Sequence, residues 1–357
     1  PFMKSTTKVT PIAGRQSAEH ERLATRFPEK EGWKKWGPYL AERQWGTVRE
    51  DYSDHGTAWD YFPHDHARSR VYRWGEDGIA GISDVDQRLC LSLALWNGRD
   101  PILKERLFGL TNGEGNHGED VKELYYYLDA TPTHSYLKML YKYPQGEFPY
   151  GRLAEENRRR GIGQPEFELI DSGLLDDDRY FDVYVEYAQA EAEDILVKIT
   201  AFNRGPAAAR LDLLPQLWFR NTWGWKRGAA RPGIGLANDT TLLARHAELG
   251  AYHLYTDGDP TLLFTDNESN SERLWGSPNA TPYVKDAFHR RVIDGDVHAV
   301  NPASTGTKAA AWYQLEVPAQ GSVEIRLRLT KNTHVHPFSD FESLFADRRT
   351  ETDEFYA

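Results

Sequence analysis

The stretch SVEIRLRL, residues 322–329, decides the fold class. Apolar side chains occupy positions 323, 325, 327 and 329, and charged side chains occupy the three positions between them. Because successive side chains of a strand point to opposite faces of a sheet, this period of two predicts a β-strand with one buried and one polar face.

The same alternation recurs along the chain from about residue 41. Strands are predicted at residues 88–96, 180–187, 194–202, 209–219, 251–256, 261–265 and 310–317, with turn residues between most of them. Helices are predicted only at residues 18–27, 133–141, 152–160 and 340–357. Many strands, hairpin-type turns and few helices predict a mainly β protein of stacked antiparallel sheets.

Composition excludes several classes of function. The chain has 357 residues, with 54 acidic and 43 basic side chains and a formal net charge of -11. An acidic surface disfavours nucleic acid and anionic membranes as main partners. No apolar run is long enough for a spanning helix. Cys90 is the single cysteine, so no internal disulfide can form, and a cytoplasmic location is the simplest expectation.

Residues 59–84, WDYFPHDHARSRVYRWGEDGIAGISD, contain the first cluster of candidate functional residues. His64 and His66 flank an aspartate, and an extended His-x-His segment can direct two imidazoles to one metal ion if His117 or Glu119 adds a ligand. The positive charges of the arginines that follow disfavour a bound metal cation. We therefore expect no metal and no cofactor here, and predict that Asp65 pairs with Arg68 and pins a loop.

Residues 108–136 contain a glycine-rich loop without the Lys-Ser/Thr of a phosphate-binding loop. Its amide, imidazole and carboxylate side chains suit sugar hydroxyls, which both donate and accept hydrogen bonds. The alternative is a solvated loop that caps a sheet. In LWFRNTWGW, residues 217–225, an extended backbone would place Trp223 and Trp225 on one side. These rings are predicted either to join the core or to stack on a sugar or another domain.

The candidate substrate-binding residues combine flat rings, carboxylates and hydrogen-bonding side chains. They are Trp59, Asp60, Asp65, Arg68, Trp74, Glu76, Asp77, Asn116, His117, Glu119, Trp223 and Trp225. Glycoside hydrolysis needs two positioned carboxylates. No spacing in the sequence selects a pair, so we assign no catalytic residue.

Three long strings carry a family resemblance. QWGTVREDYSDHGTAWDYFPHDHARSRVYRWGEDGIAGISD (44–84), LALWNGRDPILKERLFGLTNGEGNHGEDVKE (93–123) and LLPQLWFRNTWGW (213–225) resemble the N-terminal region of large bacterial proteins related to family 63 glycoside hydrolases. These proteins are similar to processing α-glucosidases that act on mannosyl oligosaccharides. The resemblance covers roughly residues 40–357.

The resemblance implies a galactose-mutarotase-like β-supersandwich, followed by a helical linker and an α-helical toroid that holds the catalytic acid and base. It divides the chain into an N-terminal arm with a tag remnant (1–40), the supersandwich (41–335) and the start of the linker (336–357). The implied partners are the toroid of the same chain and an oligosaccharide. On this reading the fragment is inactive alone, and the loops near residues 59–77 and 112–120 face the pocket.

The sequence leaves two alternatives to this resemblance. In the first, the chain is a stand-alone carbohydrate-binding module. In the second, it is a mutarotase-like sugar epimerase with a histidine acid and a carboxylate base. His117 and Glu119 are the candidates for that pair, although they lie close together on one loop.

Overall fold

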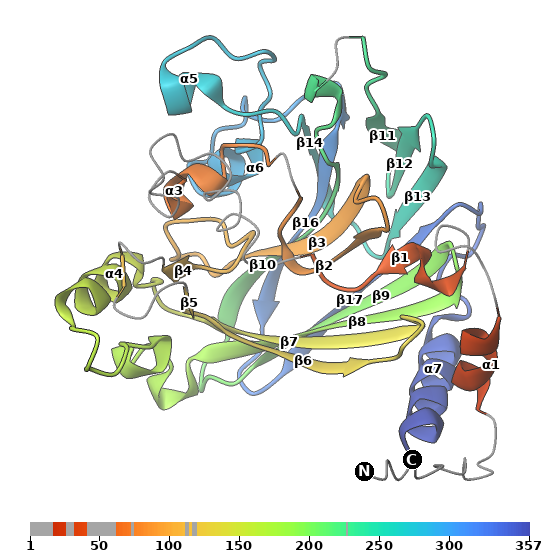
Figure 1. Cartoon of the computed structure of the whole chain (residues 1–357), viewed down its shortest axis with the longest axis horizontal. Coiled ribbons are helices and arrows are strands. Elements are labelled where there is room, and N and C mark those ends of the chain that lie inside the picture. The colour runs from red at the N-terminus through yellow and green to blue at the C-terminus, as the bar shows by residue number, and fades with distance from the viewer. Residues whose placement is uncertain are drawn as a thin grey trace, which may run out of the picture.

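The computed structural model describes residues 17–25, 32–40, 62–72, 75–110, 114–115, 120–225 and 228–357. Within these residues the chain forms two large antiparallel sheets of six and nine strands, together with a two-stranded sheet (Figure 1). The predicted mainly β fold class of stacked antiparallel sheets is confirmed. No helix among the described residues is both long enough and apolar enough to cross a bilayer.

The six-stranded sheet has its central strands buried on both faces. In spatial order its strands are β1 (Trp36–Gly37), β2 (Ile79–Asp84), β3 (Leu89–Trp96), β10 (Ala209–Phe219), β16 (Lys308–Val317) and β14 (Thr261–Thr265).

The nine-stranded sheet packs against it. In spatial order its strands are β15 (Thr305–Gly306), β11 (Gly233–Asn238), β12 (Thr241–His246), β13 (Gly250–Thr256), β17 (Ser322–Thr330), β9 (Asp194–Asn203), β8 (Tyr180–Glu191), β7 (Tyr136–Pro144) and β6 (Leu124–Ala130). The small sheet pairs β4 (Gly109–Leu110) with β5 (Asp120–Val121).

The main core lies between the two large sheets. The apolar side chains of β17, from Val323 to Leu329, join it as their alternation predicts. Leu91 and Leu93 of β3 enter the same core, whereas Cys90 and Ser92 lie buried on the opposite, outer face of the strand. Burial on both faces follows because further segments cover the outer face of the six-stranded sheet.

Helices are short and lie outside the sheets. They are α1 (Ala18–Ala24), α3 (His64–Ala67), α4 (Tyr150–Arg159), α5 (Ser271–Trp275), α6 (Ala287–Val292) and α7 (Phe341–Tyr356), with 3-10 turns η1 (Trp33–Lys35), η3 (Leu169–Ser172), η4 (Asp176–Asp178) and η5 (Trp223–Trp225). The helices predicted at residues 152–160 and 340–357 are confirmed as α4 and α7. The one predicted at 18–27 is present as α1.

The helix predicted at residues 133–141 is wrong, because this segment forms β7. Tyr136, Leu137, Leu140 and Tyr141 fit a helical spacing, but Leu137, Met139 and Tyr141 also alternate and enter the main core. Strand β7 pairs with β8 along its whole length and with β6 over Leu137–Lys142. Pairing on both sides overrides the local helical pattern.

Helices cover part of the outer face of each large sheet. The helix α7 lies on the nine-stranded sheet next to α1 (Figure 1), and Phe341 and Phe345 pack against Tyr136 and Leu196. On the six-stranded sheet, Phe288 of α6 packs in a cluster with residues of β3, β10 and β16. The segments that contain α3, α5 and α6 therefore lie over the outer face of this sheet, near its centre.

Candidate functional site

The histidine-rich segment forms a single helical turn, α3. On a helix, residues two apart point in different directions, so His64 and His66 do not present their rings to one ion. Within the part of the chain that the structure describes, no three His, Cys, Asp or Glu side chains group as metal ligands.

The predicted pairing of Asp65 with Arg68 is confirmed. Arg68 Nη2 lies 2.8 Å from Asp65 Oδ1 across one turn of α3. A second arginine, Arg273 of α5, donates from Nη2 to Asp65 Oδ2 at 2.7 Å. Partial burial raises the pKa of Asp65, but the two guanidinium groups outweigh it and hold the pKa below its ordinary value. The two arginines therefore keep the Asp65 carboxylate ionised and hold its two oxygens in place.

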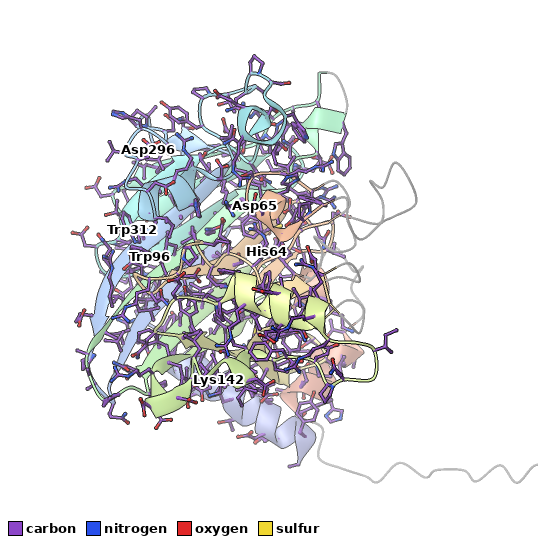
Figure 2. The ribbon with its side chains drawn as sticks, turned by 90° about the vertical axis from the view of Figure 1, so that its left-hand side faces the viewer. His64, Asp65, Trp96, Lys142, Asp296 and Trp312 are labelled. Atoms are coloured by element: carbon purple, nitrogen blue, oxygen red, sulfur yellow. The ribbon has the colours of Figure 1, made fainter. Side chains whose placement is uncertain are left out.

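An aromatic groove lies where the two predicted sugar-facing segments meet. It has a volume of about 280 Å³. Its lining comes from α3, the strand β4 and its flanks, and α4, and comprises Pro63, His64, Asp65, Ile102, Phe108, Leu110, Glu114, Tyr150, Gly151, Ala154 and Arg158. Figure 2 shows His64 and Asp65 close to the yellow-green helix α4. The structure thus brings residues from 62–77 and 108–120 to one site.

The groove has rings at its base and polar groups around them. The His64 ring stacks near the Tyr150 ring with centroids 5.9 Å apart, and it meets Phe108 edge-on at 5.0 Å. The Tyr150 hydroxyl donates to Asp100 Oδ1 at 3.0 Å. Burial and the nearby Asp100 carboxylate raise the pKa of Tyr150 well above its ordinary value. Asp65, Glu114 and the Arg158 side chain complete the polar part of the lining.

Glu76 and Asp77 lie beneath the surface and do not line the groove. They are 2% and 5% exposed, above the centre of the six-stranded sheet. Asp77 Oδ2 accepts hydrogen bonds from the Tyr72 hydroxyl and from Arg106 Nε, both at 3.1 Å. Burial raises the pKa of Glu76 to about 7, against the attraction of Lys285. A substrate-binding role for Glu76 and Asp77 stays a prediction.

Trp223 and Trp225 form the 3-10 turn η5, so the extended segment predicted for them is wrong. The strand β10 ends at Phe219, and the chain then turns beside Glu268. Trp223 Nε1 donates to Glu268 Oε1 at 2.6 Å, and Trp225 is 49% exposed. Neither ring lines the groove. Their predicted role at a sugar or domain interface stays open.

Six other predicted residues lie outside the described residues: Trp59, Asp60, Trp74, Asn116, His117 and Glu119. Their assignments stay predictions.

The sequence did not single out Phe108, Tyr150 or Arg158 as site residues. Phe148 and Tyr150 place two rings at the start of α4, which begins at Tyr150, and this pair is the local signal that marks the base of the groove.

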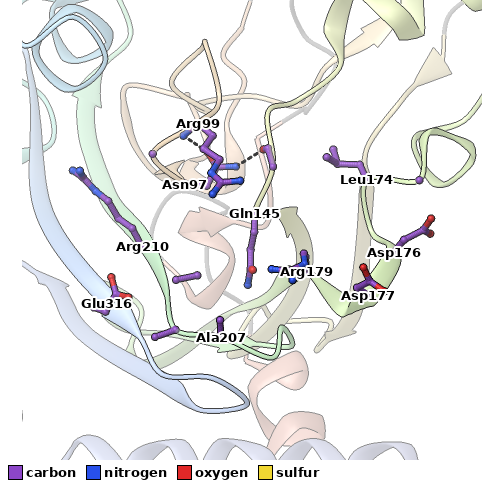
Figure 3. A pocket seen from close by; sticks show the side chains of 15 residues that line it. Asn97, Arg99, Gln145, Leu174, Asp176, Asp177, Arg179, Ala207, Arg210 and Glu316 are labelled. Carbon is purple, nitrogen blue, oxygen red and sulfur yellow. Dashed lines mark hydrogen bonds between the residues drawn. The ribbon is translucent and has the colours of Figure 1, made fainter.

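A second pocket of about 630 Å³ also escaped the sequence analysis (Figure 3). Arg99, Arg179, Asp176, Asp177 and Glu316 are among its lining residues, and no aromatic side chain belongs to the lining. It offers charged groups, amides and the small apolar side chains of Ala207, Ala208 and Ala209, but no ring among the described residues.

Comparisons with known proteins give one clear relative. No family model matches the chain. A Saccharomyces cerevisiae protein, described as "Uncharacterized protein YMR196W", is 42% identical over an alignment of 394 residues that covers 95% of this chain and 36% of that protein. The chain thus spans about a third of the length of this curated relative.

A galactose mutarotase related enzyme from Lactobacillus acidophilus aligns over 71% of this chain and 90% of its own, with 8% identity and a TM-score of 0.27. A score this low does not establish a shared fold. The fold class therefore rests on the two sheets themselves.

Proposed function

We propose that this chain is a non-catalytic β-sandwich domain of a glucosidase-type glycoside hydrolase, and that its aromatic groove contributes to the rim of the sugar pocket. The resemblance of residues 44–84, 93–123 and 213–225 to family 63-related proteins supports the class. The division into an arm, a sandwich and a linker, the partner toroid and the cytoplasmic location belong to this proposal.

The composition of the groove is the observation that carries the proposal. Sugars present flat C–H faces and hydroxyl groups, so they fit sites that combine rings with mixed donors and acceptors. Phe108, Tyr150 and His64 supply the rings, while Arg158 supplies donors and Asp65 supplies acceptors. The larger pocket of Figure 3 lacks the rings and fits a sugar less well.

The described carboxylates support a non-catalytic role. A glycosidase needs an acid and a base or nucleophile about 5–10 Å apart on either side of the sugar. Asp65 is held ionised by two guanidinium groups, which disfavours it as an acid. Glu76 and Asp77 are buried below the surface. The length of the yeast relative, of which this chain spans 36%, is consistent with a further domain that carries the chemistry.

Hydrolysis of a panel of α-glucosides by the full-length protein and by residues 1–357 alone tests the proposal. We expect hydrolysis by the full-length protein only. Cleavage by residues 1–357, or acceleration of aldose mutarotation in a polarimeter, would overturn it in favour of a self-contained enzyme.

The groove itself is tested by Arg158→Ala in the full-length protein. Loss of one hydrogen-bond donor to a sugar should lower kcat/KM for oligosaccharides about fivefold to fiftyfold. Arg179→Ala, which removes a guanidinium from the lining of the larger pocket, is the matched control and should leave kcat/KM unchanged. Equal loss in both variants would contradict the assignment of the groove.

A further inference from the structure

The helix α3 is too short to hold its own position. It spans His64–Ala67, and its N-cap residue Pro63 makes no side-chain cap. Isolated helices shorter than about 12 residues are marginal in water, because nucleation is costly. The position of His64 and Asp65 in the groove therefore depends on contacts that α3 makes with other segments.

Lys285 provides a buried contact of this kind. Its Nζ donates to Arg70 O at 2.7 Å and to Ala67 O at 3.1 Å, and lies 4.0 Å from the centroid of the Tyr72 ring. Lys285 is 4% exposed. The carbonyls that end a helix lack partners within it, and a cation there satisfies them and complements the helix dipole. Lys285 thus caps the end of α3 from below.

Further residues of the same segment hold the backbone that follows α3. Asp286 Oδ2 accepts from the Ser69 hydroxyl at 2.6 Å. The backbone N–H of Asn270 donates to Ser69 O at 2.8 Å, and the Ser269 hydroxyl accepts from Val71 N at 3.0 Å. Residues 269–286 therefore contact the chain on the C-terminal side of α3 at several consecutive positions.

Arg273 of α5 adds a contact on the side of α3 nearest the groove. It donates to Asp65 Oδ2 at 2.7 Å and to the Ser69 hydroxyl at 3.1 Å. Figure 1 shows α3 below α5 and beside α6. One segment thus contacts α3 at Asp65 through Arg273 and at Ala67 through Lys285.

Buried charges of both signs surround Lys285. Glu76 and Asp77 attract its ammonium group, whereas Arg106 and Lys308 repel it, and all four line a small buried cavity with it. A buried lysine is stable only when opposite charges and acceptors surround it. The two carboxylates and the Ala67 and Arg70 carbonyls supply these for Lys285.

We propose that residues 269–286 clasp α3, with Lys285 as a positioning residue that keeps His64 and Asp65 in place at the aromatic groove. The proposal rests on the proposed function in one respect only, namely that the groove is where sugar binds. The clasp itself is a property of the fold and is measured without any ligand.

Hydrogen exchange of the full chain provides the test. The double variant Lys285→Met/Glu76→Gln removes the cap while it keeps the charge balance. Peptides that cover residues 62–72 should exchange about tenfold faster or more, because two charged hydrogen bonds to the end of α3 are lost. The matched control is Lys198→Met/Glu342→Gln, which removes a similarly buried lysine on the nine-stranded sheet that pairs with Glu342 at 2.8 Å and does not contact α3. The control should change exchange there by less than about twofold.

Unchanged exchange at residues 62–72 in the Lys285 variant, or equal acceleration in both variants, would overturn the clasp. If either double variant fails to fold, Asp286→Asn is compared with Asp182→Asn. Asp286 holds Ser69, whereas the buried Asp182 of β8 pairs with Arg204 at 2.7 Å and contacts neither α3 nor residues 269–286. Faster exchange of residues 62–72 only in Asp286→Asn supports the clasp, and equal exchange in the two variants contradicts it.

Affinity for maltotriose is the second readout. In the Lys285 variant it should fall at least about fivefold, with no change in the Lys198 control. Faster exchange without any loss of maltotriose affinity would leave the clasp standing and would count against the groove as the sugar site. The two failures are therefore distinguishable.

Discussion

The outer faces of the two sheets are covered in opposite ways. On the nine-stranded sheet, α7 packs Phe341 and Phe345 against the outer face, and its ion pairs to the sheet keep the α7 partner exposed, with Glu342 64% and Arg349 44% exposed. On the six-stranded sheet, charged side chains occupy the centre. Lys285 and Lys308 are 4% and 3% exposed there.

The two kinds of contact have different physical effects. Apolar contacts are non-directional, so the apolar surface area that α7 buries stabilises its packing on the sheet. Buried charges are costly unless each one keeps its partner in good geometry, so they fix a segment in one register. The apolar cover therefore serves stability, and the charged cover serves the placement of α3 at the groove.

The largest expected effect comes from one buried charge in the charged cover. Glu105→Gln leaves Lys308 without its carboxylate, from which Nζ lies 2.8 Å away. Removing one partner of a buried pair costs about 3–5 kcal/mol of unfolding free energy. Urea unfolding measures the loss, and Glu105→Met/Lys308→Met should recover most of it. A loss below about 1 kcal/mol would erase the contrast between the covers.

The apolar cover should respond to Phe345→Ala with a loss of about 3–4 kcal/mol. The Phe345 side chain is fully buried against the outer face of the nine-stranded sheet. Because no titratable group is removed, the loss should be equal at about pH 6 and about pH 9. A loss that differs strongly between these conditions would show that the exposed charges of α7 matter more than its rings.

The strands and their inner faces could be predicted from sequence because period two is a local signal. The β17 alternation and the leucines of β3 required no knowledge of neighbours. The burial of Ser92 and Gln216 on the outer face could not be predicted, because the residues that cover them come from distant segments such as Lys285. The helix prediction for the β7 segment failed for the same reason, because pairing with neighbouring strands such as β8 decides between helix and strand.

The candidate site shows the same limit. The pair Asp65–Arg68 lies within one turn and was predicted, whereas Arg273 reaches Asp65 from 208 residues away. Phe108 and Tyr150 meet with ring centroids 5.0 Å apart although they lie on separate elements. Spacing along the chain carries no information about such contacts.

The charged cover should also make the unfolding free energy depend on pH, an effect that the apolar cover lacks. Burial raises the pKa of Glu76 from 4.5 to about 7 and lowers that of Lys285 from 10.5 to about 8. Between pH 4.5 and about 7 the folded protein keeps a proton on Glu76 that the unfolded chain releases, so stability falls as pH rises. Between about pH 8 and 10.5 the unfolded chain keeps the Lys285 proton that the folded protein has released, so stability rises with pH.

These two trends predict a minimum in the unfolding free energy between about pH 7 and pH 8, with a depth of about 1–3 kcal/mol. Urea unfolding across this range measures it. Subtraction of the curve of Lys285→Met/Glu76→Gln isolates the contribution of the pair. A flat difference curve would mean that the pair does not titrate in this window, and the charged cover would then resemble the apolar one.

The smallest expected effect on stability lies at the groove. The Asp65 side chain is 58% exposed, and solvent screens its pairs with Arg68 and Arg273. Asp65→Asn should therefore cost less than about 1 kcal/mol of unfolding free energy. Because the neutral amide holds the two guanidinium groups less firmly, affinity for maltotriose should fall about threefold to tenfold.

The matched control is Asp296→Asn, at an ion-paired aspartate on a loop remote in sequence, and it should leave affinity unchanged. A loss of stability as large as that of Glu105→Gln would instead place Asp65 with the buried network, and the division between a stabilising interior and a ligand-facing α3 would not hold.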